Sequence, residues 1–392
     1  MKLLVCGALG FVVSLACAQA ASAGASASPA SIPWTQLTVG YRPAPETDEG
    51  GLWMIGDKAE EEIRTSPLLV KDPALNAYLR KIVCKLSGPY CASIRIYILD
   101  VPHVNAIMAP NGVLQIWSGL LLRTKNEAQI AFVLGHELSH YLLRHTIAQY
   151  RRIREQAGAV AVLGALTAGI GNIARAGLDG SIASFSREEE RDADARGFEL
   201  ATAAGYDPAQ CVALWQQELD EESAAPMQNR ETSQFAESHP PTSERLVTLS
   251  AMATAAEAHN RNWNIGTEAY KSAIVRFRGQ WMNENLSLAH FEQSLVILQG
   301  LLQAEPRSGE LEYFLGELYR RRNGDGDAIK AVAAYQAAIA AGGAPPLVYR
   351  GLGLISMKSG DKATAREAFQ QYLHALPAAD DHAMIEYYLT QL

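Results

Sequence analysis

The run FVLGHELSHY, residues 132–141, places two histidines around a glutamate. In an α-helix each residue advances by about 100°, so His136 and His140 stand one turn apart on the same face. Two imidazoles at that spacing can share one metal ion, and Glu137 then lies beside the ion, where it can accept a proton from water. The spacing therefore predicts a metal-dependent hydrolytic site. In a continuous helix His145 turns to the opposite face, which excludes it as a ligand.

A third ligand is needed, because a pattern as short as H-E-x-x-H also arises by chance. The run SREEERDADARG, residues 186–197, supplies a candidate in Glu190, with Asp194 one helical turn further on. Two neutral imidazoles and one carboxylate make three protein ligands and leave a fourth position for water, a donor set that predicts one Zn²⁺ per chain. Asp194 is expected to accept a hydrogen bond from the far nitrogen of a ligand histidine. Glu188 and Glu189 are fallback ligands, and a solvated charged helix face is the alternative for the whole run.

Short strand signals precede a helical segment. SIRIYILD (93–100) and GVLQIWSG (112–119) are β-branched or aromatic runs closed by turn residues. From Asn126 to about Arg152 the apolar period becomes helical, with Asn126 and Gln129 placed as a capping box. The histidine pair therefore lies inside a predicted helix. A peptide substrate is expected to lie as an extended strand along an edge formed by residues 113–117, because main-chain pairing holds a peptide without demanding a sequence.

Beyond residue 260 strand signals vanish and a helical repeat can be counted. Gly316 lies 37 residues before Gly353, close to the 34-residue period of tetratricopeptide units. The extra residues fit the turn-rich NGDGD at 323–327, and residues 382–392 fit a capping helix. The positions that follow the repeat are Pro306, Leu315, Gly316, Tyr319, Tyr335, Tyr349, Leu352, Gly353, Gly360, Ala365, Phe369 and Pro377. The spacing predicts at least two tetratricopeptide repeats after a degenerate one, with a plain helical bundle as the alternative.

The N-terminus reads as an export signal. Residues 1–20 combine an early lysine, a short apolar core and a small-residue end at Ala18-Gln19-Ala20, as in a cleaved secretory leader. An uncleaved membrane anchor and a lipoprotein modified at Cys17 are the weaker readings. The Ala, Ser, Gly and Pro that follow suit a flexible spacer. An oxidising compartment would permit one disulfide, and Cys84 with Cys91 is the favoured pair, against three buried thiols that include Cys211.

The composition and net charge limit the classes of binding partner that are expected. The 392 residues are 48% hydrophobic, enough for a full core and more than one domain. A formal net charge of −8 offers no broad basic surface, so nucleic acid is not expected as a partner. Residues 157–174 carry no charge, but their apolar character comes mostly from Ala and Gly. A Gly-rich buried helix or a flap over the site is favoured there over a membrane span, with peripheral contact to lipid left open.

Four ordered motifs together resemble a known family. GHELSH followed by SREEERDADARG is similar to the gluzincin zinc metallopeptidases of the HtpX and CAAX-prenyl-protease class. NAIMAPNGVLQIWSGLL resembles the strand and turn before the zinc helix of that class, and SHPPTSERL its later His-Pro and Arg element. A leader ahead and tetratricopeptide units behind resemble the exported BepA-like branch. The likeness covers roughly residues 50–392, and Asp192 departs from it where relatives often have glutamate.

The resemblance implies roles for further residues. Glu190 fills the third-ligand position of the family pattern S-R-x-x-E-x-x-A-D, which runs from Ser186 to Asp194 here. His239 matches a family histidine that approaches the metal, either by filling its fourth position at rest or by donating to the oxyanion during reaction. Arg245 matches an arginine that braces this region. A helix-entry histidine and a surface arginine are the plainer readings of these two residues.

The sequence thus predicts an α+β chain. A mainly helical zincin-type metallopeptidase domain with a small sheet is expected over residues 50–258, behind a signal peptide (1–20) and a spacer (21–49). An all-α tetratricopeptide domain is expected over residues 259–392. The expected function is a zinc-dependent endopeptidase that degrades misfolded or stalled proteins in the periplasm, with repeats that bind clients or an outer-membrane assembly machine. The alternative is a non-proteolytic chaperone or adaptor with a silent or plugged zinc site.

Overall fold

The computed structural model describes residues 37–157, 185–225, 239, 243–258 and 262–392. The predicted leader, most of the predicted spacer and residues 158–174 of the uncharged segment lie outside these ranges. Within the ranges, no helix combines the length and the apolar character needed to cross a bilayer.

A three-stranded sheet lies beside the helix that carries the histidine pair. Its strands are β1 (Arg95–Leu99), β2 (Ala106–Met108) and β3 (Val113–Trp117), in the order β1-β3-β2. β3 pairs with β1 in parallel and with β2 antiparallel, and every side chain of β3 is buried. The two predicted strands are confirmed as β1 and β3. β2, only three residues long, was not predicted.

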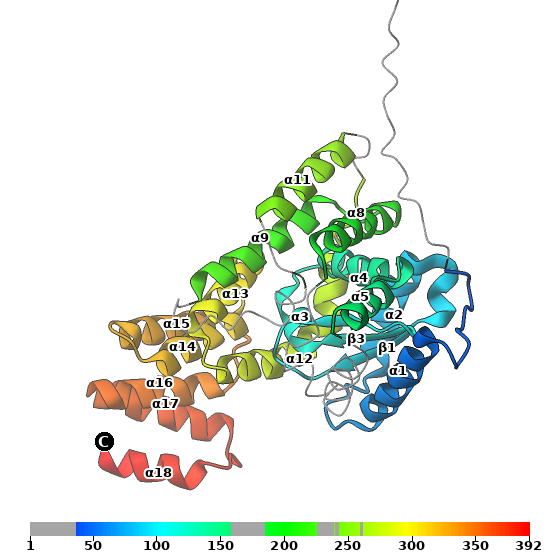
Figure 1. Cartoon of the computed structure of the whole chain (residues 1–392). Helices are drawn as coiled ribbons and strands as arrows, with labels where there is room; N and C mark the ends of the chain where they lie inside the picture. Colours follow the sequence, from blue (N-terminus) through cyan, green and yellow to red (C-terminus); the bar gives the residue numbers. More distant parts are fainter. Residues whose placement is uncertain (1–36, 158–184, 226–238, 240–242, 259–261) are drawn as a thin grey trace, which may run out of the picture. The chain divides into compact units, whose positions relative to one another are not determined.

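Besides this sheet, the described residues of the first part of the chain form helices (Figure 1). They are α1 (Asp48–Thr65), α2 (Pro73–Ser87), the 3₁₀-helix η1 (Gly88–Ser93), α3 (Ser118–Arg123), α4 (Glu127–Leu142), α5 (His145–Ala157), α8 (Arg187–Ala203), α9 (Ala209–Ala224) and α11 (Ser243–Glu257). α4 is buried along nearly its whole length because it packs on α2, α8, α9 and β2. A disulfide joins Cys84 on α2 to Cys91 in η1, the pair that the sequence favoured, and Cys211 is a buried free thiol.

The predicted continuous helix from Asn126 to about Arg152 is wrong. α4 starts as predicted, because the Asn126 side chain accepts from the Gln129 amide at 2.9 Å. The Gln129 side chain, however, accepts from the Lys125 amide at 2.7 Å, so the reciprocal bond of a capping box is shifted by one residue. α4 ends at Leu142, Arg144 adopts a left-handed backbone with φ of 61°, and a new helix begins at His145. The angular argument that placed His145 away from the site therefore does not apply.

The C-terminal part is helical throughout its described residues, as expected. Its helices are α12 (Thr267–Ser287), α13 (Phe291–Ala304), α14 (Gly309–Arg322), α15 (Asp327–Ala341), α16 (Leu347–Ser359), α17 (Lys362–Ala375) and α18 (His382–Gln391), drawn from yellow to red in Figure 1. α14 packs on α15, and α16 packs on α17. Gly316 lies against the Tyr335 ring and Gly353 against the Phe369 ring, so the same small-to-aromatic contact recurs in both helix pairs. The tetratricopeptide assignment stays a prediction that this recurrence favours.

The fold class is confirmed: a mostly helical chain with one small sheet, followed by a helical C-terminal region. The described residues from 37 to 392 form one compact unit by their internal contacts. The boundary near residue 258 between a peptidase domain and a repeat domain stays a prediction.

Candidate metal centre

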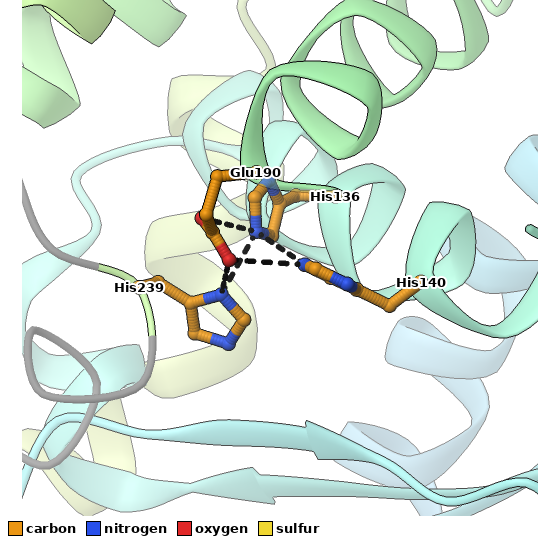
Figure 2. A group of neighbouring side chains, drawn as sticks. All are labelled: His136, His140, Glu190 and His239. Carbon is orange, nitrogen blue, oxygen red and sulfur yellow. Dashed lines mark hydrogen bonds and ion pairs between the residues drawn. The ribbon is translucent and has the colours of Figure 1, made fainter. Parts of the chain in front are cut away.

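The two histidines and the glutamate predicted as ligands lie together in the structure (Figure 2). His136 and His140 stand one turn apart on α4, with their Nε2 atoms 3.1 Å from each other. Oε2 of Glu190 lies 3.6 Å from Nε2 of His136, and Oε1 lies 3.5 Å from Nε2 of His140. All three side chains are buried. Two separate helices, α4 and α8, thus direct nitrogen and oxygen donors at one point.

His239 joins this group as a fourth member. Its Nδ1 lies 3.1 Å from Nε2 of His136 and 2.8 Å from Oε1 of Glu190. The candidate ligand atoms of His136, His140, Glu190 and His239 all lie within 4.8 Å of one another. Nε2 of His239 is 3.4 Å from Oε1 of Glu137. His239 therefore stands between the ligand group and the glutamate predicted to handle protons.

Local structure selects Glu190 among the three neighbouring glutamates. Ser186 and Glu189 close a capping box that starts α8: the Glu189 amide donates to Ser186 Oγ at 3.2 Å, and the Ser186 amide donates to Glu189 Oε2 at 2.9 Å. Glu189 also forms a two-bond ion pair with Arg152, both contacts at 2.7 Å. Glu188 is exposed. With Glu189 engaged elsewhere and Glu188 facing solvent, Glu190 is the carboxylate of this run that faces the histidines.

Asp194 lies where the sequence predicted it, one turn along α8. Its Oδ1 is 3.0 Å from Nδ1 of His136. Arg245 binds the same carboxylate through two bonds of 2.7 Å, and its Nη1 lies 3.1 Å from Oε2 of Glu190 and donates to the His239 carbonyl at 3.1 Å. The Trp215 ring covers the guanidinium, with 4.0 Å from Cζ to the ring centroid. Arg245 thus braces Asp194, Glu190 and His239 from the side away from the imidazole Nε2 atoms.

Burial and neighbouring charges set the protonation of the site. Burial favours the neutral form of Glu190, but the hydrogen bonds of His140 and His239 outweigh it and hold the pKa of this carboxyl well below its usual range. Burial lowers the pKa of His140 well below its usual value, which favours the neutral imidazole that a metal requires. For Glu137 burial dominates and raises the pKa, against the opposing effect of His239. The ligand carboxylate is therefore kept ionised while the neighbouring glutamate holds a proton more readily.

Two further pKa shifts concern His136 and the carboxylate of Asp194 that it contacts. Burial opposes the charged form of His136, yet the Asp194 hydrogen bond and the charges of Glu190 and Asp194 outweigh it and raise the pKa of His136. Asp194 itself has a lowered pKa, because the Arg245 charge outweighs the effect of burial. The negative charges of these two carboxylates therefore favour the protonated form of His136.

The residues present fit a zinc ion. Glu190 Oε2 and Glu137 Oε1 are buried without a hydrogen bond, although Arg245 lies 3.1 Å from the former. Nδ1 of His136 is engaged by Asp194 and Nδ1 of His140 by His145, which leaves both Nε2 atoms directed at the ligand group. Two imidazole nitrogens with one carboxylate is a donor set typical of catalytic zinc.

The predicted substrate edge at residues 113–117 is wrong, because β3 is the central strand and both of its edges are paired. β1 and β2 are the two outer strands, and β2 is the one that packs on α4. The Ala109 amide donates to the Val113 carbonyl and the Trp117 amide to the Asn105 carbonyl, so the main-chain groups of odd-numbered residues face β3. By alternation those of Ala106 and Met108 face away from it. The Met108 main chain forms a hydrogen bond with the Glu137 carboxylate, which places this outer edge beside the site.

Two aromatic residues near the ligands were missed by the sequence-based prediction, and a third was wrongly excluded. Phe185 stacks on the His140 ring at 4.0 Å between centroids, and Trp215 lies edge-on to the His136 ring at 6.3 Å. Neither residue lies at a motif position, so no sequence pattern points to it. His145 was considered and set aside on the assumption of a continuous helix. In the structure its Nδ1 lies 3.0 Å from Nδ1 of His140.

A helix with a His-Glu-x-x-His face and a glutamate ligand from a second helix defines the gluzincin class of metallopeptidases. Comparison with known proteins agrees with this class. Residues 70–253 match the model for Peptidase family M48, which supports a zinc metallopeptidase domain in this part of the chain.

Three relatives illustrate the similarity. The beta-barrel assembly-enhancing protease of Yersinia pestis is 29% identical over 183 residues, which cover 43% of this chain and 37% of the relative. The metalloprotease YcaL of Escherichia coli K12 is 31% identical over 147 residues, covering 36% and 55%. The mitochondrial metalloendopeptidase OMA1 of Schizosaccharomyces pombe is 29% identical over 169 residues, covering 43% and 49%. The matches thus span less than two thirds of each relative.

Proposed function

We propose that this protein is a zinc-dependent endopeptidase that cleaves unfolded or misfolded polypeptides in the cell envelope. The observation that carries the proposal is the convergence of His136, His140 and Glu190 on one buried point with Glu137 beside them. A zinc ion held there supplies a Lewis acid that polarises a peptide carbonyl and makes water acidic enough to react near neutral pH.

The chain's own residues divide the remaining work. Glu137 accepts the proton of the attacking water and delivers it to the leaving amine. Its raised pKa, caused mainly by burial, suits a group that must hold this proton between the two steps. Asp194 fixes the tautomer of His136 by accepting from Nδ1, and Arg245 fixes Asp194 in turn. Arg245 therefore acts as a positioning residue behind the ligands.

The substrate lies along the outer edge of β2. The outward-facing main-chain groups of Ala106 and the Met108 carbonyl pair with an extended peptide, while the Met108 amide donates to Glu137 and so brings the peptide carbonyl toward that carboxylate. Main-chain pairing carries little side-chain preference, which supports unfolded polypeptides as the substrate class. A folded protein offers few unpaired strands of this kind.

His239 sets the resting state. Its Nδ1 lies 2.8 Å from the ligand carboxylate and 3.1 Å from a ligand nitrogen, so it stands in the space that water or a substrate carbonyl needs. We assign it the role of a plug that leaves when substrate enters. Of the two roles that the sequence left open, this geometry supports the resting one.

Location and partners are also proposals. The leader-like N-terminus supports export, and the name of the Yersinia pestis relative supports a link to outer-membrane β-barrel assembly. We propose a periplasmic protein whose C-terminal helices bind clients or the assembly machinery. A non-proteolytic adaptor is the second candidate, favoured by the position of His239 in the ligand group.

Metal content and cleavage tested together decide the main proposal. Purified protein should contain about one zinc per chain and should cleave an unfolded test protein. A chelator should abolish cleavage, and added zinc should restore it. A metal-free protein, or cleavage that survives complete zinc removal, would refute the proposal.

A further inference from the structure

The two ligand histidines are held on their far sides by different chemistry. Nδ1 of His136 meets the Asp194 carboxylate at 3.0 Å, and Arg245 holds that carboxylate through two bonds. Nδ1 of His140 meets another imidazole nitrogen, Nδ1 of His145, at 3.0 Å. His145 is buried, and its ring lies 5.0 Å from the His140 ring, edge to face.

Only one tautomer pair satisfies this contact when a metal is bound. His140 directs Nε2 at the ligand group, so that nitrogen must be free of hydrogen to bind an ion. Its proton then resides on Nδ1, which must donate to Nδ1 of His145. His145 in turn must be neutral, with its own proton on Nε2.

The break between α4 and α5 is what brings His145 to this place. Arg144 holds a left-handed backbone conformation, which an L-residue other than glycine adopts only at a cost of about 1 kcal/mol. Its guanidinium is anchored by the buried Glu49 carboxylate of α1 and lies 5.2 Å from the Tyr41 ring centroid. The contacts of Arg144 thus hold an unfavourable backbone conformation at this turn. That conformation places the His145 side chain next to His140 on α4.

We propose that His145 is the positioning residue of the second zinc ligand: it accepts the Nδ1 hydrogen of His140 and so fixes that ring with Nε2 toward the metal. The inference rests on the metal-dependent function proposed above and adds a residue to its site. His145 does not touch the metal or the substrate.

Asparagine and glutamine at position 145 separate this role from simple packing. Asparagine places its amide oxygen near the position of the native Nδ1, whereas glutamine places the same group one bond further out. We expect His145→Asn to retain most of the zinc affinity and His145→Gln to lose about ten- to a hundredfold, the usual effect of removing a ligand's hydrogen-bond partner. Zinc affinity is measured by competition with a chromophoric chelator, and thermal stability is measured on the metal-free proteins.

Arg151→Ala is the matched control, because Arg151 lies on the same helix and pairs with Asp48 at an exposed position. It should bind zinc as the native chain does. Equal zinc affinities for the asparagine and glutamine variants, or tighter zinc binding by the glutamine variant, would overturn the role of His145. The proposed function would still stand if the native chain binds zinc. A native chain that binds no zinc would overturn both.

Discussion

Gly135 on α4 and Gly197 on α8 cross with their backbones in contact. A Cβ on Gly197 would lie 2.6 Å from the backbone nitrogen of His136, and a Cβ on Gly135 would lie 2.8 Å from the Gly197 carbonyl oxygen. Gly197 is seven residues from Glu190, two turns along the same face of α8. The missing side chains at this crossing let α8 approach α4 closely enough for Glu190 to reach the two histidines.

Gly197→Ala should separate the two helices. The added methyl meets backbone rather than a flexible side chain, so we expect a loss of about 1–3 kcal/mol in stability together with weaker zinc binding. Urea unfolding and a zinc competition assay measure the two effects. Gly51→Ala on α1 is the control, because a Cβ there meets nothing within 4 Å and should stabilise the helix by up to about 1 kcal/mol. Native zinc affinity in Gly197→Ala would contradict this account of the crossing.

Glu137→Gln should retain zinc and lose cleavage. Glutamine keeps the size of the side chain but cannot accept the proton of water, and loss of general base catalysis costs about 10²–10⁴ in rate. Metal analysis and digestion of an unfolded protein measure the outcome. Native activity in this variant would remove Glu137 from the mechanism. The same variant also tests the adaptor alternative: rescue of envelope integrity in a strain lacking the protein would show that cleavage is dispensable.

Glu190→Ala should lower bound zinc well below one ion per chain, because it removes the carboxylate that faces both imidazoles. Glu188→Ala is the matched control on the same turn, since Glu188 is exposed. Metal content after dialysis against a weak chelator compares the two. Stoichiometric zinc in Glu190→Ala would assign the ligand role to another residue.

His239→Ala should speed the cleavage of unfolded protein without changing the zinc content, because it empties the space beside Glu190 and Glu137. Initial rates at saturating substrate are the measurement. A lower rate instead would favour the other role left open by the sequence, donation to the oxyanion.

The raised pKa of the buried Glu218 carboxyl predicts that the stability of the fold depends on pH. Burial, and then the charge of Glu221, raise its pKa from 4.5 to about 8. The folded chain therefore binds this proton more tightly than the unfolded chain does, so the contribution is present in full below about pH 4.5 and is lost as the pH rises toward about 8. Glu218→Gln should flatten the decline in unfolding midpoint across this window. An unchanged decline would show that Glu218 is not its source.

The metal site was largely predictable, because helical spacing is a local property. His136 and His140 face the same way in any helix, and Glu190 and Asp194 repeat that spacing, so two short segments defined the ligand group before any tertiary contact was known. The brace from Arg245 and the approach of His239 needed the family resemblance, since His239 lies 45 residues beyond Asp194 and neither residue repeats the spacing of the ligands.

The predictions that failed, the end of α4 and the substrate edge, concern features that leave no periodic pattern in the sequence. The end of α4 depends on Arg144, whose left-handed backbone is held by Glu49 from a distant helix, and no glycine or proline marks the turn. β2 is too short to show an alternating pattern, which is why the substrate edge was placed on β3. Strand order is a tertiary property, and local signals do not specify it.

The short length of β2 limits how strongly its edge can bind a peptide substrate. Three residues offer a handful of main-chain bonds, too few to pull a strand out of a neighbour whose own sheet is intact. For the proposed function we therefore expect that only a polypeptide that has already lost its own strand pairing can enter, and that envelope proteins with intact sheets are spared whatever their sequence.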